Sequence, residues 1–560
     1  MKPVFKAYNQ GQATLFPVSL DSKIPQDSPA RLVNQIVNGL DISKVLSTYQ
    51  GGGSSSYSPR MMLKLVIFAY LNNIYSCRKI EDAVRDRFTF AWLAGGLEPD
   101  HNTINRFRSQ RLKDTVNDIF TQVVILLVEM GYLSLDVAYV DGTKMESRAN
   151  RYTFVWRKAV ERNRDRLEAK IRQVLEYIEE GIMQDDRPDD EPPTPINSQA
   201  LKERIAAINA SNRTASLPPK EKKGVAKAVK TLESKHLPKL EEYEKHLDTL
   251  GGRNSYSKTD PDATFMRLKD DHMRNGQLKP AFNLQISTEN QFISHFDFFA
   301  NPTDFLTLKP FVDGFKARFE ERFGRVLERL VADSGYGSEE NYEYMEGHGI
   351  EPFVKFPMFH KEQKRAFRNN AFLAQNLFYN EEKDFYVCPM GQRMEKVGEA
   401  QRQSDSGFTS RVSYYQAKNC TGCPLRCLCF KAKGNRRIEV NHRLNRHKER
   451  ARALLTSEEG LYHRSRRPVE PEAVFGQSKS NKQYYRFRHF GKDLIAMDFA
   501  IFAMAFNMGK LHQKRKNTPQ NGRKTNVSTI LNGFVIHFGV EYRKSLQSDA
   551  CHAQNQKLAA

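Results

Sequence analysis

The segment Asp136-Val137-Ala138-Tyr139-Val140-Asp141-Gly142-Thr143 is an apolar run that closes on an aspartate, a glycine and a small polar residue. A run of this length and composition is typical of a short buried strand. We expect this strand to end at Asp141. The segment Val331-Ala332-Asp333-Ser334-Gly335 has the same form, with a strand expected over residues 325–332 and Asp333 directly after it. The two segments predict two carboxylates held rigidly at the ends of buried strands.

A third carboxylate lies in Glu470-Pro471-Glu472-Ala473-Val474-Phe475-Gly476. Glu472 is expected to open a helix, and Lys479 then lies two helical turns further along the same face. Glu470 is the alternative third carboxylate, and the dipole of a helix offers a purely structural reason for glutamates at its start. Three converging carboxylates are able to hold two divalent cations about 4 Å apart, the arrangement that supports in-line attack at a phosphodiester.

The composition points to a polyanionic partner. The 560 residues include 87 Lys and Arg against 66 Asp and Glu, which gives a formal net charge of +21. Such an excess favours nucleic acid, because neutralised phosphates release condensed counterions; a generically basic surface is the alternative. The longest apolar run, residues 494–508, contains Asp498 and is expected to be a buried core helix rather than a membrane span. Seven cysteines without a signal-peptide pattern favour a reducing, cytoplasmic setting without membrane contact.

Strand and helix patterns alternate after residue 280, which indicates an α/β fold. Densely charged helical sequence precedes them over residues 153–250, with the breaker-rich segment 185–195 favouring a helical hairpin. We expect an N-terminal extension and linker (1–54), an all-α DNA-binding domain (55–131), a catalytic domain in three pieces (132–152, 251–380 and 460–511), a helical insertion (153–250), a cysteine-rich insertion (381–459) and a basic C-terminal tail (512–560).

A short basic helix is predicted in the N-terminal domain. The segment His101–Arg111 carries Arg106, Arg108 and Arg111 together with several amide side chains. Arginines and amides on one short helix are suited to contacts with DNA phosphates and bases. The alternative interpretation is an ordinary solvated helical face.

Five cysteines cluster in the region before Glu472. Cys388, Cys420, Cys423 and Cys429 have the residue types and the CxxC spacing of a four-cysteine structural zinc site. Cys427 is an extra thiol that is able to replace Cys429. Unpaired buried cysteines are the alternative to a metal site.

Taken together, these segments resemble the DDE transposases of bacterial insertion sequences, near the eleven-eighty-two family in the broader IS-four-like group. The resemblance runs from about Pro59 to Leu511. It rests on Pro59-Arg60-Met61-Met62-Leu63-Lys64, Val140-Asp141-Gly142-Thr143-Lys144, Tyr152-Thr153-Phe154-Val155-Trp156, Asp260-Pro261-Asp262-Ala263, Ala332-Asp333-Ser334-Gly335-Tyr336-Gly337-Ser338 and Val469-Glu470-Pro471-Glu472-Ala473-Val474-Phe475-Gly476.

The resemblance implies an RNase H-like catalytic domain in which Asp141, Asp333 and Glu472 form the Asp-Asp-Glu triad and hold two Mg²⁺ or Mn²⁺ ions. Related transposases often have a Tyr-x2-Arg-x3-Glu-x6-Lys signature. Glu472 and Lys479 fit its last part, whereas Arg466 has the arginine spacing only if Glu470 is the ligand. Lys479 and Arg466 are expected to contact DNA.

The implied activity is metal-dependent cleavage of DNA at terminal inverted repeats, followed by strand transfer into target DNA. The implied assembly is a homodimer in a synaptic complex, in the bacterial cytoplasm at the nucleoid. A nuclease of the same fold without strand transfer and an inactive DNA-binding derivative of a transposase are the alternatives.

Overall fold

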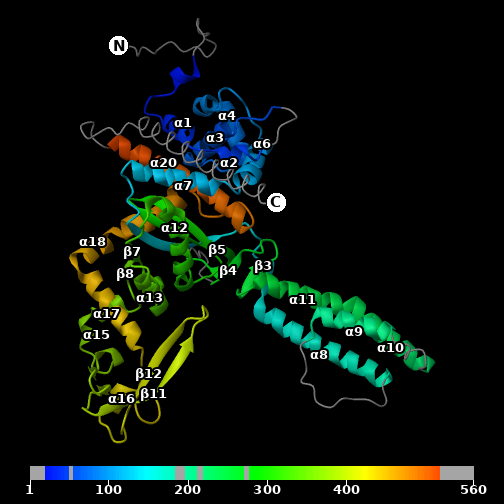
Figure 1. Cartoon of the computed structure of the whole chain (residues 1–560), viewed down its shortest axis with the longest axis vertical. Helices are drawn as coiled ribbons and strands as arrows, with labels where there is room; N and C mark the ends of the chain where they lie inside the picture. The colour runs from blue at the N-terminus through cyan, green and yellow to red at the C-terminus, as the bar shows by residue number, and fades with distance from the viewer. Residues whose placement is uncertain (1–18, 50–54, 183–195, 211–217, 270–275, 518–560) are drawn as a thin grey trace, which may run out of the picture.

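The structure, a computed structural model, describes residues 19–49, 55–182, 196–210, 218–269 and 276–517. Figure 1 shows N-terminal helices packed on a central sheet, from which a helical arm and a smaller β lobe project in different directions. The fold is mixed α/β with a helical N-terminal region.

The N-terminal helices share one apolar core with a helix from the other end of the described chain. α3 is buried along most of its length, and α20 packs along both α3 and α7. This packing brings the two ends of the described chain together. The helices are α1 (Pro29–Gly39), α2 (Ser43–Leu46), α3 (Pro59–Leu71), α4 (Cys77–Asp86), α5 (Phe88–Leu93), α6 (His101–Arg106), α7 (Val116–Glu129) and α20 (Lys492–Asn517).

Helix α1 lies in the segment that the sequence predicts as an extension and linker. Ser28 caps it by accepting a hydrogen bond from the Ala30 amide, and Pro29 occupies its first turn, as is typical of helix starts. Leu32 and Ile36 are buried in the shared core. This helix was missed in the sequence because its apolar pattern covers only eleven residues and is followed by a glycine- and serine-rich run, which favours a linker.

The central sheet combines antiparallel and parallel pairs. Strand β1 pairs antiparallel with β5 and parallel with β7, and β8 continues the parallel side. Both β4 and β6 pair antiparallel with β5. The elements are β1 (Val137–Glu146), β4 (Thr264–Arg267), β5 (Leu278–Glu289), β6 (Phe292–Phe299), α12 (Leu308–Phe323), β7 (Arg329–Ala332), α13 (Glu339–Gly347), β8 (Glu351–Val354), α14 (Phe359–Glu362) and α15 (Arg365–Arg368).

Strand β1 is longer than the sequence predicts. It continues past Asp141 to Glu146, because its second half pairs with β5 as far as Ala281. Asp141 therefore lies within a strand, and the expectation that the strand ends there is wrong. Asp333 does follow β7 directly.

The helical arm has a core of its own. Ile171, Leu175 and Ile178 on α8 pack with Leu240 on α11, as the spacing of these apolar residues predicts. The arm is joined to the rest of the chain through a pair of short antiparallel strands, β2 and β3. The breaker-rich segment 185–195, predicted to separate the two helices of a hairpin, lies outside the described residues. The arm comprises β2 (Phe154–Trp156), α8 (Arg157–Ile182), α9 (Ser198–Ala210), α10 (Pro219–Thr231), α11 (Leu237–Leu250) and β3 (Ser255–Ser257).

The β lobe carries the five clustered cysteines. Its five strands are antiparallel in the order β13-β12-β11-β10-β9, around a small core that includes Tyr386, Met394 and Tyr415. Its elements are β9 (Phe378–Asn380), β10 (Phe385–Val387), β11 (Arg393–Gln403), β12 (Thr409–Ala417), α16 (Arg426–Cys429) and β13 (Arg437–Val440).

A helical connection leads from this lobe back to the sheet. α17 (His442–Thr456) is followed by α18 (Glu458–Arg466), a π-helical turn over Pro468–Glu472, α19 (Ala473–Gly476) and a second π-helical turn over Gln477–Asn481. Glu472 therefore lies inside this helical run, and the expectation that it opens a helix is wrong. The true start is at Ser457, whose side chain caps α18.

Helix α20 is long and apolar enough to cross a membrane, with a mean hydropathy of 1.5 in its most apolar window. However, 78% of that window is buried inside the protein. Its neighbours are α3, α7 and β6. It is therefore a core helix, as expected from Asp498 in its sequence.

Candidate active site

The three predicted carboxylates meet around one guanidinium group, that of Arg467. One guanidinium nitrogen, Nη2, lies 3.4 Å from Asp141 Oδ1 and 3.8 Å from Asp333 Oδ2, while Nη1 lies 2.5 Å from Glu472 Oε1. The Arg467 side chain is only 7% exposed, whereas Glu472 is 48% exposed. Segments far apart in the chain thus place three carboxylates at one partly open site.

The two aspartates are neighbours because their strands are neighbours. β1 and β7 run parallel, with Tyr139 opposite Val331. Asp141 lies two residues further along β1, and Asp333 lies two residues beyond Val331, directly after β7, so the two aspartates are close together at this point of the sheet.

The π-helical turn explains how Arg467 reaches Glu472. In an α-helix, residues four apart lie on the same face, and this is the separation of Arg466 and Glu470, which form an ion pair at 3.0 Å. A π turn closes with a spacing of five residues, which is the separation of Arg467 and Glu472. Two adjacent arginines are therefore directed at two different glutamates.

Glu470 has a different environment from Glu472. Its side chain is 1% exposed and accepts hydrogen bonds from the backbone N–H of Gln291 at 2.8 Å and from the Arg466 guanidinium. This carboxylate links the helical connection to the turn between β5 and β6. Glu472, by contrast, faces the two aspartates through Arg467.

Burial and charge act differently on the two aspartates. Burial raises the pKa of Asp141 to about 6, although Arg467 and the Gly142 amide favour its ionised form. Burial also acts on Asp333, but the positive charge of Arg467, the Ser334 amide and Lys355 together lower its pKa. The site therefore holds one carboxyl group that is easily protonated and one that stays ionised.

A fourth carboxylate, which the sequence did not single out, lies beneath the site. Asp304 Oδ1 accepts hydrogen bonds from Asn283 Nδ2 at 2.9 Å and Gln285 Nε2 at 3.0 Å. Gly142 packs so closely over this pair that a Cβ atom there would lie 2.1 Å from Gln285 Nε2. The glycine after Asp141 was the available sign of such a close approach; no sequence pattern points to Asp304.

Two lysines border the carboxylates. Lys479 Nζ donates a hydrogen bond to Thr143 Oγ1 at 2.9 Å, on the strand that carries Asp141. Lys355 Nζ lies 3.8 Å from Asp333 Oδ1. The predicted proximity of Lys479 to the site is therefore seen, and Lys355 was not anticipated.

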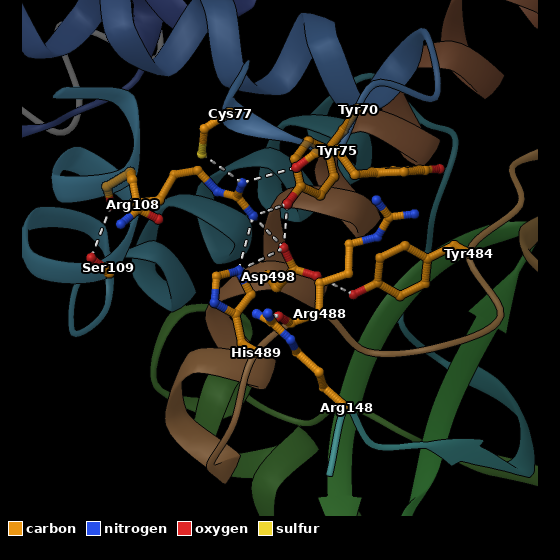
Figure 2. A network of polar contacts seen from close by, with 11 residues as sticks. Tyr70, Tyr75, Cys77, Arg108, Ser109, Arg148, Tyr484, Arg488, His489 and Asp498 are labelled. Carbon is orange, nitrogen blue, oxygen red and sulfur yellow. Dashed lines mark hydrogen bonds and ion pairs between the residues drawn. The ribbon is translucent and has the colours of Figure 1, made fainter. Parts of the chain in front are cut away.

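The three arginines of the expected DNA-contacting helix differ in exposure. Arg108 is 2% exposed and forms an ion pair with Asp498 of α20 at 2.5 Å (Figure 2). Its guanidinium also contacts the Tyr75 carbonyl and the Tyr70 hydroxyl. Arg108 is therefore an internal structural residue, and we withdraw the expectation that it binds DNA.

Arg111 is also engaged within the protein. It donates to the Thr48 carbonyl and lies 4.5 Å from the centre of the Tyr49 ring. Arg106 is exposed to solvent. Of the three arginines, Arg106 is the one that the fold presents freely at the surface.

The four cysteines predicted as zinc ligands line one small cavity. Its volume is about 20 Å³, and its walls include Cys388, Cys420, Cys423 and Cys429. Cys427 is exposed and does not line it. A glycine with positive φ lies in each of the two cysteine-containing turns. Gly391, at 79°, follows Cys388, and Gly422, at 72°, lies between Cys420 and Cys423. The tight turns expected around a metal are therefore present.

No three Asp, Glu, His or Cys side chains within the described ranges are placed to hold a metal ion as they stand. At the carboxylates, the Arg467 guanidinium lies between the side chains of Asp141 and Glu472. The chemistry of the donors nevertheless suits a metal in both places: carboxylate oxygens fit Mg²⁺ or Mn²⁺, and four thiols fit Zn²⁺.

Two segments of the chain match known protein families. Residues 387–512 match a family described as "Transposase DDE domain", a span that contains Glu472 and the four cysteines. Residues 18–110 match "Transposase domain (DUF772)". No curated protein matches the chain. The chain is therefore similar to a transposase DDE domain over residues 387–512 and to an N-terminal transposase domain over residues 18–110.

Proposed function

We propose that this protein is the transposase of a bacterial insertion sequence, which cuts DNA and joins it to a target with the triad Asp141, Asp333 and Glu472. The observation that carries the proposal is the meeting of these three carboxylates around one cation, Arg467. The two aspartates on adjacent parallel strands of a mixed sheet support an RNase H-like catalytic domain. The family assignment within insertion sequences, near the eleven-eighty-two family, rests on the sequence resemblance.

The residues of the site have separable roles in this proposal. Asp141, Asp333 and Glu472 would hold two Mg²⁺ or Mn²⁺ ions, which supply activation of the attacking hydroxyl group and stabilisation of the leaving oxygen. The backbones of β1 and β7 fix the two aspartates, because both strands are paired and buried. Lys479 and Lys355 place positive charge where the phosphates of a bound strand would lie.

The DNA contacts follow from what the fold leaves exposed. The N-terminal domain would bind the terminal inverted repeats, with Arg106 among its exposed basic side chains. Arg466 is half-buried and paired with Glu470, so we assign it to the support of the helical connection rather than to DNA. A homodimer that holds both element ends is the assembly implied by the resemblance.

The triad is tested by conservative substitutions. D141N, D333N and E472Q each keep the shape of the side chain and remove its charge, so we expect each to abolish cleavage of a plasmid that carries the DNA flanking the gene. Electrophoretic mobility shifts with the same DNA should remain within about twofold of wild type. Full cleavage by all three variants would overturn the assignment.

A second assay separates a transposase from a nuclease of the same fold. Pre-cleaved DNA ends with free 3′-hydroxyl groups are supplied together with a target plasmid and Mg²⁺ or Mn²⁺. We expect joined products. Cleavage of the flanking DNA without any joining would instead assign the protein as a nuclease, and DNA binding without cleavage would assign an inactive derivative.

We further propose that Cys388, Cys420, Cys423 and Cys429 hold a structural Zn²⁺ ion. The cavity that they line and the hydrogen bonds to sulfur from Arg436, at 3.3 Å to Cys420 and 2.9 Å to Cys429, support this proposal. Purified protein should contain about one zinc per chain by mass spectrometry of metals. C423S should lose it and C427S should keep it; zinc in equal amount in both variants would contradict the site.

A further inference from the structure

Arg467 occupies the position in which a cation is most needed. Its guanidinium contacts one oxygen of each of the three carboxylates. Ionised carboxylates this close repel one another unless a positive charge lies between them. The guanidinium is therefore placed to act as a counter-ion of the triad.

The polar contacts of this guanidinium within the described part of the chain are those to the three carboxylates. The Arg467 Nε is buried and has no hydrogen-bond acceptor in the described part of the chain. An unsatisfied buried N–H is unfavourable, so the position of the side chain is set by its charge pairs with the carboxylates. A group held in this way is free to move when the charge of its partners is neutralised by another cation.

We propose that Arg467 is a built-in competitor of the divalent cations, which fills the carboxylate site before metal binds and is displaced from it when metal binds. This inference rests on the proposed function, because it takes the triad as the metal site. Hard divalent cations take carboxylate oxygens as ligands, and these are the atoms that Arg467 contacts. The repulsion between the guanidinium and an incoming cation weakens metal binding for as long as Arg467 remains in place.

Substitution of a competitor and substitution of a supporting residue are expected to change the affinity for metal in opposite directions. Removal of a residue that orients metal ligands weakens metal binding. Removal of a competitor strengthens it. The substitution R467Q is therefore expected to increase the affinity for divalent cations about tenfold, which corresponds to about 1.4 kcal/mol of binding free energy.

The experiment is a calorimetric titration of the full-length protein, without DNA, with Mn²⁺ and with Ca²⁺. Four proteins are compared: wild type, R467Q, R464Q and D141N. Arg464 lies one helical turn before Arg467 and contacts the Leu455 carbonyl and the Phe359 ring, so R464Q removes a nearby positive charge without removing a contact to the triad. D141N reports whether the metal binds at the triad at all.

The outcomes separate the inference from the function on which it rests. Tighter binding in R467Q, unchanged binding in R464Q and lost binding in D141N support both. Binding that D141N loses but R467Q leaves unchanged or weaker overturns the competition and keeps the metal site. Binding that D141N does not affect overturns the metal site itself.

A melting experiment covers the case in which R467Q folds poorly. Without metal, R467Q should melt at a lower temperature than wild type, because three carboxylates lose their counter-ion. Saturating Ca²⁺ should raise the melting temperature of R467Q more than that of wild type. R467K, which keeps the charge on a different head group, should lie between the two in both measurements, and a larger Ca²⁺-induced increase in wild type than in both variants would overturn the proposal.

Discussion

Two glutamates in one π-helical turn have opposite roles at the scale of single residues. Glu470 is buried against the Gln291 amide and Arg466, whereas Glu472 is half-exposed at the triad. E470Q should lower the free energy of unfolding by about 1–3 kcal/mol, because it removes the charge of a buried carboxylate that pairs with the half-buried Arg466 and accepts from the Gln291 backbone N–H. E472Q should change it by less than about 1 kcal/mol. Urea unfolding without metal measures both, and the reverse order would contradict these assignments.

Gly142 carries a second prediction at this scale. A Cβ atom at this position would lie 2.1 Å from Gln285 Nε2 and 2.9 Å from Asp304 Oδ1, so the strand next to Asp141 must shift. G142A should cost about 1–3 kcal/mol of stability and reduce cleavage. G252A is the matched control, because nothing lies within 4 Å of its Cβ atom. Equal stability of the two variants would show that the close approach is unimportant.

The packing of α12 on β6 gives a pH-dependent prediction at the scale of elements. Burial lowers the pKa of His295 well below its ordinary value, and the nearby charge of Arg318 acts in the same direction. The unfolded chain therefore binds a proton first as the pH falls below about 6.5, and stability is lost in that range. His295 packs against Phe311 and Phe315, so it belongs to the apolar core.

Comparison of wild type with H295L isolates this effect. The two proteins are unfolded with urea at pH 8 and at pH 5. The wild type should lose up to about 1.4 kcal/mol per pH unit more than H295L below pH 6.5. The same pH dependence in both proteins would place the charge change elsewhere.

The sequence predicts many elements well and some local geometry poorly. The strand before Asp333 and the alternation of strands and helices after residue 280 are present as predicted, because alternation and helical spacing are strong local signals. The length of β1 depends on pairing with β5, which is distant in sequence. The start of the helix with Glu472 is obscured by Pro468 and Pro471, which the π-helical turn accommodates.

The sequence predicts the three carboxylates of the candidate site, but it does not predict the residues that surround them. Asp141, Asp333 and Glu472 stand beside glycines or apolar runs, and the structure brings them around one group. Their catalytic role stays a prediction. Arg467 was not predicted, because its pairing with Glu472 follows a π-helical spacing of five residues. Asp304 was not predicted, because it is distant in sequence and lies near the site through its contact with Gln285.

At the scale of the whole molecule, a buried ion pair joins the N-terminal helices to α20. Figure 2 shows Arg108 and Asp498 with the hydroxyl groups of Tyr70 and Tyr484 on the same carboxylate. R108M removes the arginine partner of this buried carboxylate, leaves His489 at 3.5 Å as its remaining basic neighbour, and should cost about 3–5 kcal/mol. The double variant R108M/D498L should recover part of this loss, because the uncompensated charge is also removed.

The control for this prediction is R106M, two residues away on the solvent-exposed side. It should change the free energy of unfolding by less than about 0.5 kcal/mol. Additive losses in the double variant would show that Arg108 and Asp498 do not act as a pair.

The position of α20 also has a consequence for the order of events during synthesis. The ribosome completes α3 and α7 early, but the helix that covers them is made near the end of the described chain. Nascent chains tend to fold domain by domain from the N-terminus, and here the first domain stays unfinished until residue 511 has emerged. Glu472 is likewise made after both aspartates. A chain interrupted during translation before α20 therefore lacks a closed N-terminal core, and one interrupted before residue 472 also lacks the third of the three clustered carboxylates.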